Sequence, residues 1–526
     1  MSQAAATPKT TENSDSLTAD SSTTNPSTTD SLITVSATTS ATKTNATNDT
    51  YSPSTDLANA PLKAGIVIVG AGMAGSRLAI ELARAWQDTD SENVPSITLI
   101  SKEPQVGYNR IMLSPVLAGE KDFADTYLYD QADYKALGIT IIAGVAVATI
   151  DTDSQYLTLD NGHTLDYAKL VLATGSTARV IPFPNHDAKD VHVFRDLADV
   201  TALSDYAKQG KTGLVIGGGV LGLEAACALA KQGANMTVIH VDGYVLNQQL
   251  DWPAAELLQA ELARRHVGLE VSAMSERIEV NDAGEVTGLI MKGGRRIPTD
   301  FIVMAVGVIP NTVLAKDSGI EVNRGIVVDD CMHTSARNVY AIGECVELNE
   351  ELFGMVAPVN QQVDTLVTVL SQTKKHWQPY VSKPLSLKLK VSGVSAFSAG
   401  QIEFAEAEQE AVETIVYRQP NDDHYQCLYI KDDALVGAVL YGEVTEGSFY
   451  SQLITKQTDI TPIKGDLIYG EAYCNLETPV PIAAETPSTT ETAAITKTAA
   501  LTKTESTLAA TDSAHEASSE PLNEVV

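Results

Sequence analysis

Two segments of the chain repeat one order of features, in which a short apolar run is followed by a glycine-rich turn and an amphipathic run. They are GIVIVGAGMAGSRLAIELARAW (residues 65–86) and GLVIGGGVLGLEAACALAKQG (residues 213–233). The apolar runs, Ile66–Val69 and Leu214–Ile216, have the β-branched character of buried parallel strands. A strand that turns directly into a helix is a strong constraint, and its repetition predicts an α/β chain with two nucleotide-binding folds.

The turns themselves have the spacing G-x-G-x-x-G, and each glycine has a separate physical role. The first makes the tight turn, the second lets the backbone approach a pyrophosphate, and the third lets the helix pack closely on the strand. The helix N-terminus then faces the anion. One such motif alone is weak evidence, but here both stand between a strand and a helix. The glycines are Gly70, Gly72 and Gly75 in the first turn and Gly217, Gly219 and Gly222 in the second.

A second strand in such a fold is expected to end near an acidic residue that binds a ribose. After the first turn this is Glu103, which follows the strand Ile97–Ile100; the gap is longer than usual because of a polar surface insert, QDTDSENVPS. After the second turn the strand Met236–Val241 has His240 near the expected place, with Asp242 slightly late. No arginine follows before Trp252 to bind a 2′-phosphate, which favours NADH over NADPH.

Composition separates the two ends from the middle of this chain of 526 residues. Residues 1–60 are rich in Ser and Thr, and residues 476–526 in Thr, Ala and Glu, so we expect both tails to be disordered. The net charge of −31 argues against nucleic acid and anionic membranes as partners. The sequence lacks a secretory signal and an apolar run that could span a bilayer, which predicts a cytoplasmic protein.

The five cysteines lie far apart and none forms a C-x-x-C pair. Neither a metal site, an iron–sulfur cluster nor a disulfide framework is therefore expected. Cys227 falls within the second predicted helix, where it is expected to belong to the core.

Three further segments carry a resemblance to a known family: LVLATGSTARVIP (residues 170–182), FIVMAVGVIPNTVL (301–314) and NVYAIGECVE (338–347). With the two glycine motifs they resemble the two-dinucleotide flavoprotein reductases, the FAD-dependent pyridine nucleotide-disulfide oxidoreductases. The resemblance implies that the A-T-G and A-x-G segments cross between two nucleotide domains. It further implies FAD-binding roles for Thr174, Gly175, Gly343 and Glu344, and an NAD(P)H-binding role for Gly307.

Within this family, EPQVGYNRIMLSPVLAGE (residues 103–120) and YAIGECVELNEELFGMVAP (340–358) resemble the flavin-binding part of the NAD(P)H-dependent nitrite reductase large subunit. Rubredoxin and ferredoxin reductases are similar relatives. The resemblance implies that Arg110 holds the flavin or its phosphates, and that Ser114 and Pro115 begin a helix beside the ring. Dithiol reductases of this fold carry a cysteine pair here, whereas this chain has no cysteine before Cys227.

The expected architecture is an FAD-binding domain (residues 61–180 and 301–375), an NAD(P)H-binding domain (181–300) and a small C-terminal α+β interface domain (376–475). In the last, a hairpin turning at Asp432 and Asp433 and a short helix near Gly447–Lys456 are predicted.

The function that follows is hydride transfer from NADH to FAD, with electrons passing to a separate acceptor protein. Such chemistry depends on stacking geometry, so the lack of a catalytic acid–base pair is no objection. Nitrite or nitrate reduction is the favoured setting, with rubredoxin or ferredoxin reduction as the alternative. From another class, a non-enzymatic FAD- and NADH-binding sensor or assembly factor stays open, as does a homodimer.

Overall fold

The computed structural model describes residues 65–87, 94–371, 379–382, 386–391, 393–419 and 424–474. The two tails expected to be disordered, residues 1–60 and 476–526, lie outside the described residues, as does most of the polar insert after the first helix. The chain divides into two compact units, residues 1–461 and 462–526. Within the described part, no helix is both long enough and apolar enough to cross a membrane.

The first glycine motif belongs to a seven-stranded sheet with the order β3-β2-β1-β6-β5-β4, in which β18 also pairs with β6. Strands β3, β2, β1, β6 and β18 run parallel. The sheet is extended by β5, which pairs antiparallel with β6, and by β4, which pairs antiparallel with β5. The strands are β1 (Gly65–Val69), β2 (Ile97–Ser101), β3 (Thr140–Ala143), β4 (Val147–Asp151), β5 (Tyr156–Leu159), β6 (Thr164–Leu172) and β18 (Val339–Ala341).

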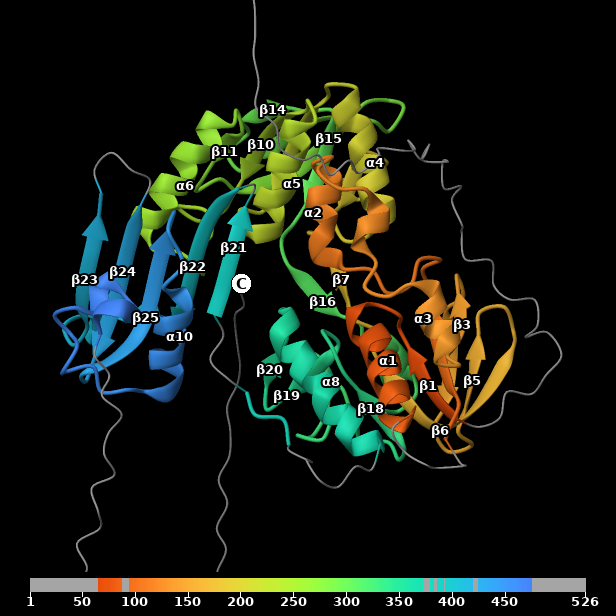
Figure 1. Cartoon of the computed structure of the whole chain (residues 1–526). Helices are drawn as coiled ribbons and strands as arrows, with labels where there is room; N and C mark the ends of the chain where they lie inside the picture. The colour runs from red at the N-terminus through yellow and green to blue at the C-terminus, as the bar shows by residue number, and fades with distance from the viewer. Residues whose placement is uncertain are drawn as a thin grey trace, which may run out of the picture. The chain divides into compact units, whose positions relative to one another are not determined.

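Two long helices from opposite ends of this fold lie side by side against the sheet, α1 (Met73–Gln87) and α8 (Val356–Ser371) (Figure 1). Arg77 of α1 joins them, since its guanidinium donates to the carbonyl of Asn360 and to the carboxylate of Asp364. The shorter elements of the same region are α2 (Leu113–Leu117), α3 (Gln131–Ala136), α7 (Val313–Asp317) and the 3-10 turns η2 (Arg110–Met112) and η3 (Phe123–Thr126).

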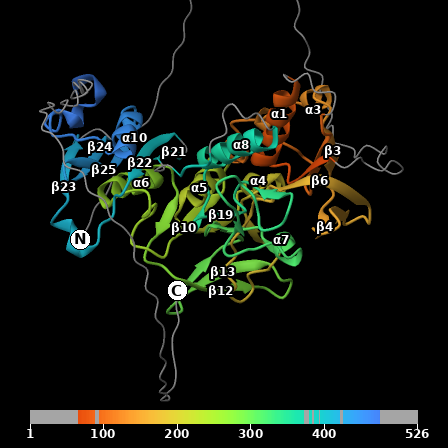
Figure 2. The same cartoon turned by 90° about the horizontal axis from the view of Figure 1, so that it is seen from below.

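The second glycine motif belongs to a five-stranded parallel sheet with the order β11-β10-β9-β15-β8. Its strands alternate between two apolar faces. Leu214 and Ile216 pack against a three-stranded antiparallel sheet, whereas Val215 packs against helices α4 and α5. Figure 2 shows β12 and β13 on the side of the sheet opposite to α5. A parallel sheet covered on both faces explains why its strands are almost wholly apolar.

The elements of this second fold are β8 (Val191–Val193), α4 (Leu197–Lys208), β9 (Thr212–Ile216), α5 (Val220–Lys231), β10 (Asn235–Ile239), α6 (Trp252–Arg264), β11 (Gly268–Glu270), β12 (Ser275–Val280), β13 (Val286–Met291), β14 (Arg296–Pro298) and β15 (Phe301–Met304). The predicted strand Met236–Val241 starts one residue earlier and ends at Ile239. His240 therefore lies just beyond the strand.

The expected domain boundary at residue 301 needs correction. Strand β15 lies between β9 and β8 in the second sheet, so the chain returns to the first fold only after Met304. The two passages between the folds are tied together as a short antiparallel pair, β7 (Ser176–Ala178) and β16 (Val308–Pro310). A small sheet of β17 (Ile326–Val327), β19 (Val346–Leu348) and β20 (Glu351–Leu352) completes the first fold.

The last sheet is antiparallel with the order β21-β22-β25-β24-β23. The predicted hairpin turn is present, and both Asp432 and Asp433 have left-handed backbone conformations (φ 52° and 58°). The predicted helix is α10 (Gly447–Lys456). The other elements are β21 (Ser386–Val391), β22 (Val394–Gly400), α9 (Glu406–Gln409), β23 (Glu413–Arg418), β24 (Tyr425–Lys431) and β25 (Ala434–Tyr441). Residues 462–474, described by themselves, form the 3-10 turns η4 (Leu467–Tyr469) and η5 (Glu471–Tyr473).

One carboxylate connects this antiparallel sheet to the second nucleotide fold. Asp251 precedes α6 and caps it by accepting the N–H of Ala254. It also accepts hydrogen bonds from the hydroxyls of Tyr425 (2.5 Å) and Tyr429 (2.9 Å) of β24, and both tyrosine side chains are buried.

We therefore expect Asp251→Ala to lower the free energy of unfolding by about 2–5 kcal/mol, since it removes a helix cap and leaves two buried hydroxyls without an acceptor. Urea unfolding would measure this. Asp205→Ala is the control, because the Asp205 carboxylate is exposed and, among the described residues, pairs with the exposed Lys208. Equal unfolding curves for the two variants would contradict the proposed role of Asp251.

Candidate functional site

A single large cavity, about 2030 Å³, is lined by residues of both nucleotide folds. A drug-sized ligand occupies a pocket of about 300–1,000 Å³, so this cavity has room for more than one large ligand. The first fold contributes its glycine turn and the segment 102–121, and the second contributes residues of α4 and α5. The passages β7 and β16 lie along the same cavity.

The first glycine turn has the geometry that its sequence predicts. Gly70 has φ +111°, and a Cβ there would lie 2.1 Å from the carbonyl oxygen of Ala173. A Cβ on Gly75 would lie 1.9 Å from the carbonyl oxygen of Gly70. A Cβ on Gly72, in contrast, would meet no protein atom within 4 Å. Gly70 and Gly72 line the cavity, whereas Gly75 serves the packing of α1 on β1.

The second turn repeats this pattern. Gly217 has φ +119° and is crowded by the carbonyl oxygen of Ala305 (2.2 Å), and Gly222 is crowded by the carbonyl oxygen of Gly217 (2.1 Å). Gly219, at the start of α5, again has open space where a side chain would be. These three glycines do not line the large cavity, although the next residues, Val220 and Leu221, do. Both turns thus leave space for a bulky anion beside a helix N-terminus.

The structure places His240 under the second glycine turn. Its Nδ1 accepts the N–H of Gly218 (3.1 Å), and its side chain is only 11% exposed. His240 does not line the large cavity, so it supports the turn from below. The acidic residue shortly after this strand is Asp242, whose side chain is half-exposed. Its carboxylate accepts a hydrogen bond from the amide of Asn247 (3.0 Å).

Glu103 and Arg110 lie together on the cavity wall and form an ion pair. The hydroxyl of Tyr108 donates to the second oxygen of Glu103 (2.5 Å), and the guanidinium of Arg110 lies 4.9 Å from the centre of the Tyr108 ring. Burial raises the pKa of Tyr108, so its hydroxyl stays a donor. Arg110 also donates to the carbonyl of Arg195 (2.8 Å), which brings the second fold to this wall.

Arg195 is the residue that the sequence analysis missed. It follows β8 and forms an ion pair with Glu344, and it donates to the hydroxyl of Ser176 (2.8 Å). Its position two residues after a parallel strand was the available signal, because ligands bind at the carboxyl ends of such strands. Two arginines, Arg110 and Arg195, therefore bring positive charge to the cavity, each paired with a glutamate of the first fold.

The remaining predicted residues of the crossings also lie at the cavity. Thr174 is fixed by Asn311, which accepts its hydroxyl with the backbone carbonyl (2.9 Å) and donates its own amide to the Thr174 carbonyl (2.8 Å). Gly175, Gly307 and Gly343 line the wall, and the Gly343 N–H donates to the buried Gln362 side chain (2.7 Å).

Ser114 contacts a second residue that was missed. Its hydroxyl donates to Glu224 of α5 (2.6 Å), and both residues line the cavity. Burial raises the pKa of Glu224, and the hydrogen bond from Ser114 opposes this shift. An acidic residue on an otherwise apolar stretch, VLGLEAACALAK, was the signal that could have identified it. The helix α2 begins at Leu113, one residue before the Ser114 expected to begin it.

Among the described residues that line the cavity there is neither a cysteine nor a histidine. Cys345, next to Glu344, is fully buried, and burial raises its pKa, which disfavours a reactive thiolate. Cys227 is buried in α5, as expected, and Cys427 is buried in β24. The described cavity walls therefore offer two arginine–glutamate pairs, and no cysteine nucleophile.

Comparisons with known proteins identify the family to which this chain is similar. The profile of the pyridine nucleotide-disulphide oxidoreductase family matches residues 64–369, and that of the rubredoxin NAD+ reductase C-terminal domain matches residues 386–458. A nitrite reductase [NAD(P)H] of Bacillus subtilis is 38% identical over 76% of this chain and 48% of its own length. The assimilatory nitrate reductase electron transfer subunit of the same organism is 37% identical over 78% of this chain and 51% of its own length.

This chain thus spans about half the length of these two curated relatives. Among solved structures, the NADH:rubredoxin oxidoreductase of Clostridium acetobutylicum superposes with a TM-score of 0.62 at 26% identity. That match covers 76% of this chain and 97% of the other.

The Ser114–Glu224 contact predicts a pH dependence of stability. Because the pKa of Glu224 is raised in the folded protein, the folded state loses stability as pH rises from the unfolded pKa towards the folded one. Glu224→Gln removes this loss, so the stability of the variant relative to the wild type should increase from acid to neutral pH. Ser114→Ala should make this loss of stability with rising pH larger than in the wild type, because the variant lacks the hydrogen bond that lowers the pKa of Glu224. Urea unfolding at several pH values would test both, and a difference for Glu224→Gln that does not change with pH would refute the prediction.

Proposed function

Because the chain belongs to the pyridine nucleotide-disulphide oxidoreductase family, we propose that it is a FAD-dependent reductase that passes electrons from NADH to a separate acceptor protein. The observation that carries this proposal is the pair of glycine turns with one geometry, in two folds whose residues line one cavity. The space left at Gly72 and at Gly219 is what a pyrophosphate requires of the chain.

In this proposal the first fold holds FAD. Gly70 and Gly72 receive the pyrophosphate. Glu103 accepts a hydrogen bond from the ribose, and Arg110 keeps the Glu103 carboxylate oriented. The region of the flavin is lined by residues of the crossings and of the cavity wall: Thr174, Gly175, Gly343, Glu344, Ser114 and Arg195. The family resemblance further assigns the backbone after Gly354, in Met355–Pro358, to the edge of the flavin ring, and these residues line the cavity.

The second fold then holds NADH. Gly217, Gly219 and Gly222 form the turn for its pyrophosphate, His240 supports that turn from below, and Gly307 leaves room beside the nicotinamide. Asp242 favours NADH over NADPH, because a carboxylate accepts from a ribose hydroxyl and repels a 2′-phosphate.

FAD, when bound, accepts a hydride from NADH and releases its electrons to the acceptor. The chain's own residues position the two nucleotides. The absence of a cysteine among the described residues of the cavity lining favours electron transfer to another protein over dithiol chemistry. In domain terms, we assign residues 61–180 and 305–375 to FAD, 181–304 to NADH and 376–475 to the interface domain.

Nitrite or nitrate reduction is the setting that the similarities favour, since the two Bacillus subtilis relatives act there by name. Rubredoxin or ferredoxin reduction is the second candidate. It is supported by the match of residues 386–458 to the rubredoxin reductase C-terminal domain and by the NADH:rubredoxin oxidoreductase structure.

The proposal also places the protein in the cytoplasm. No disulfide joins any of the five cysteines, all of which lie in the described part of the chain, and this suits a reducing compartment. Measurement of the mass in solution would show whether the protein forms a homodimer.

The test of the proposed function is reduction of the bound flavin by NADH. The purified protein should be yellow, NADH should bleach it in the absence of oxygen, and ferricyanide should then sustain turnover. Addition of a nitrite or nitrate reductase component, compared with rubredoxin and ferredoxin, would identify the acceptor by the fastest reoxidation. A yellow protein that NADH does not bleach would leave the binding sensor as the better reading.

The two glycine turns can be assigned by a reciprocal pair of variants. Gly72→Val should lower the flavin affinity at least about tenfold, equivalent to 1.4 kcal/mol, because the side chain occupies the pyrophosphate space. Gly219→Val should leave the flavin bound and weaken NADH binding by a similar factor. Neither new Cβ meets protein atoms, so the fold should be kept.

Gly70→Ala is the contrasting control, since its Cβ meets the Ala173 carbonyl and should destabilise the fold itself. Flavin content and the KM for NADH are the measurements. Loss of flavin from Gly219→Val with full flavin in Gly72→Val would show that the two sites are exchanged.

A further inference from the structure

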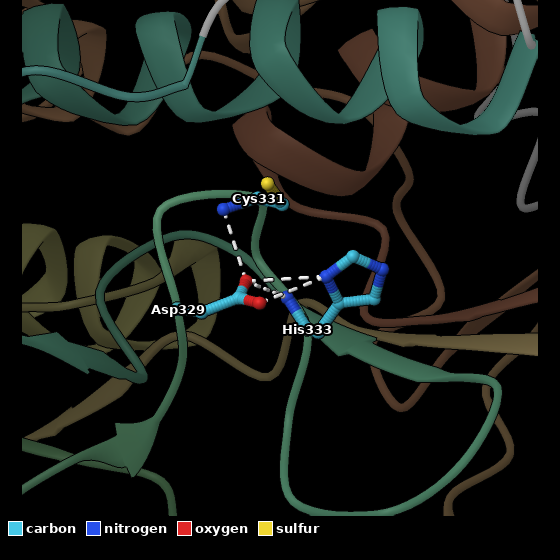
Figure 3. A group of neighbouring side chains, drawn as sticks. All are labelled: Asp329, Cys331 and His333. Atoms are coloured by element: carbon cyan, nitrogen blue, oxygen red, sulfur yellow. Dashed lines mark hydrogen bonds and ion pairs between the residues drawn. The ribbon is translucent and has the colours of Figure 1, made fainter.

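The turn between β17 and β18 gathers three different metal-ligating side chains within five residues. Asp329, Cys331 and His333 each offer one ligand atom, and these atoms all lie within 4.8 Å of one another. Figure 3 shows the His333 ring facing the Asp329 carboxylate, with Cys331 on the same turn. Among the described residues, this is the one group of this kind, and it does not belong to the nucleotide cavity.

The turn is held in place by its own backbone and by one buried residue. The Asp329 carboxylate accepts the N–H groups of Cys331 (2.9 Å) and His333 (2.8 Å). Met332, between them, has a left-handed conformation (φ 66°) and a fully buried side chain. The burial of Met332 fixes the position of its two neighbours, of which His333 is exposed and Cys331 half-buried.

The three ligand atoms lie close enough together to share one ion. Nδ1 of His333 lies 3.0 and 3.2 Å from the two Asp329 oxygens, and the ligand atoms of Asp329, Cys331 and His333 all lie within 4.8 Å of one another. A neutral imidazole, a thiolate and a carboxylate at such distances are groups that a bound metal ion can bridge.

The donor set indicates the kind of metal. A thiolate, an imidazole and a carboxylate together match zinc and similar borderline divalent ions, and disfavour magnesium and calcium, which prefer oxygen ligands alone. Asp330 adds further negative charge, with an oxygen 3.3 Å from the Cys331 sulfur.

We propose that this turn binds one zinc ion through Asp329, Cys331 and His333, with a fourth position open to water. The expectation of no metal site rested on the absence of C-x-x-C pairs, and the pattern D-x-C-x-H escapes that criterion. Since β18 follows the turn and leads to Gly343 and Glu344, zinc stabilises the segment that forms one wall of the cavity.

Cobalt(II) is the probe, because a thiolate–cobalt bond gives a charge-transfer absorption band that oxygen and nitrogen ligands do not give. The full chain, without an affinity tag and freed of metal, should bind one equivalent of cobalt with this band, measured against the spectrum of the flavin. Zinc should displace the cobalt, and the melting temperature should rise with zinc concentration.

Cys331→Ser should abolish the band, and His333→Gln should weaken cobalt binding at least about tenfold, the lower end of the loss seen when even an outer partner of a metal ligand is removed. His163→Gln is the matched control, because His163 is an exposed histidine outside this turn, and it should bind as the wild type does.

The proposal is overturned if the wild type shows no thiolate band, or if Cys331→Ser binds cobalt with the wild-type affinity and stoichiometry. Flavin content and circular dichroism report whether each variant is folded. Should Cys331→Ser fail to fold, His333→Gln alone decides: wild-type affinity in that variant overturns the proposal, and the expected loss supports it.

Discussion

The close approach of each glycine-turn helix to the strand before it is the constraint on which the rest of the structure depends. At Gly75 and at Gly222 a backbone carbonyl occupies the place that a Cβ would take. This contact brings the start of α1 or α5 beside the end of its strand, so that unpaired N–H groups point to one place. The glycine between, Gly72 or Gly219, leaves that place open. These two backbone contacts leave an open space beside each helix N-terminus, and no charged side chain is needed to form it.

The space between these sites is shaped by polar contacts between residues far apart in sequence. Ser114 meets Glu224, Arg110 meets the carbonyl of Arg195, and Arg195 meets Glu344. Each contact joins the first nucleotide fold to the second along the cavity wall. The two arginine–glutamate pairs are partly buried, with 21–32% of each side chain exposed, and pairing lowers the cost of burying the charges. In the proposed function, the phosphates and sugars of the nucleotides offer these pairs equivalent donors and acceptors.

The sequence predicted those parts of the site that depend on local chain geometry, and it failed where the partner lies elsewhere. The glycine turns, the strands β1 and β9 and the hairpin at Asp432 were predictable, because turn chemistry and periodicity are local properties. His240 has the expected place in sequence. The strand, however, ends at Ile239, and the imidazole of His240 lies beneath the second glycine turn, where it accepts the N–H of Gly218. Arg195 was missed because its partner Glu344 is 149 residues away. Strand β15 was assigned to the wrong fold for the same reason, since only pairing with β9 and β8 shows where it belongs.

By itself, therefore, the sequence determined that two nucleotide-binding turns exist and that the segments around them belong to a reductase family. Glycine spacing and apolar periodicity are local properties, so a short segment of the sequence is sufficient to show them. Only the tertiary structure decided that both folds line one cavity, that Arg110 and Arg195 meet two glutamates there, and that Asp329, Cys331 and His333 converge on one turn. Distances between side chains depend on how the backbone is folded, and a linear pattern carries no information on convergence in space.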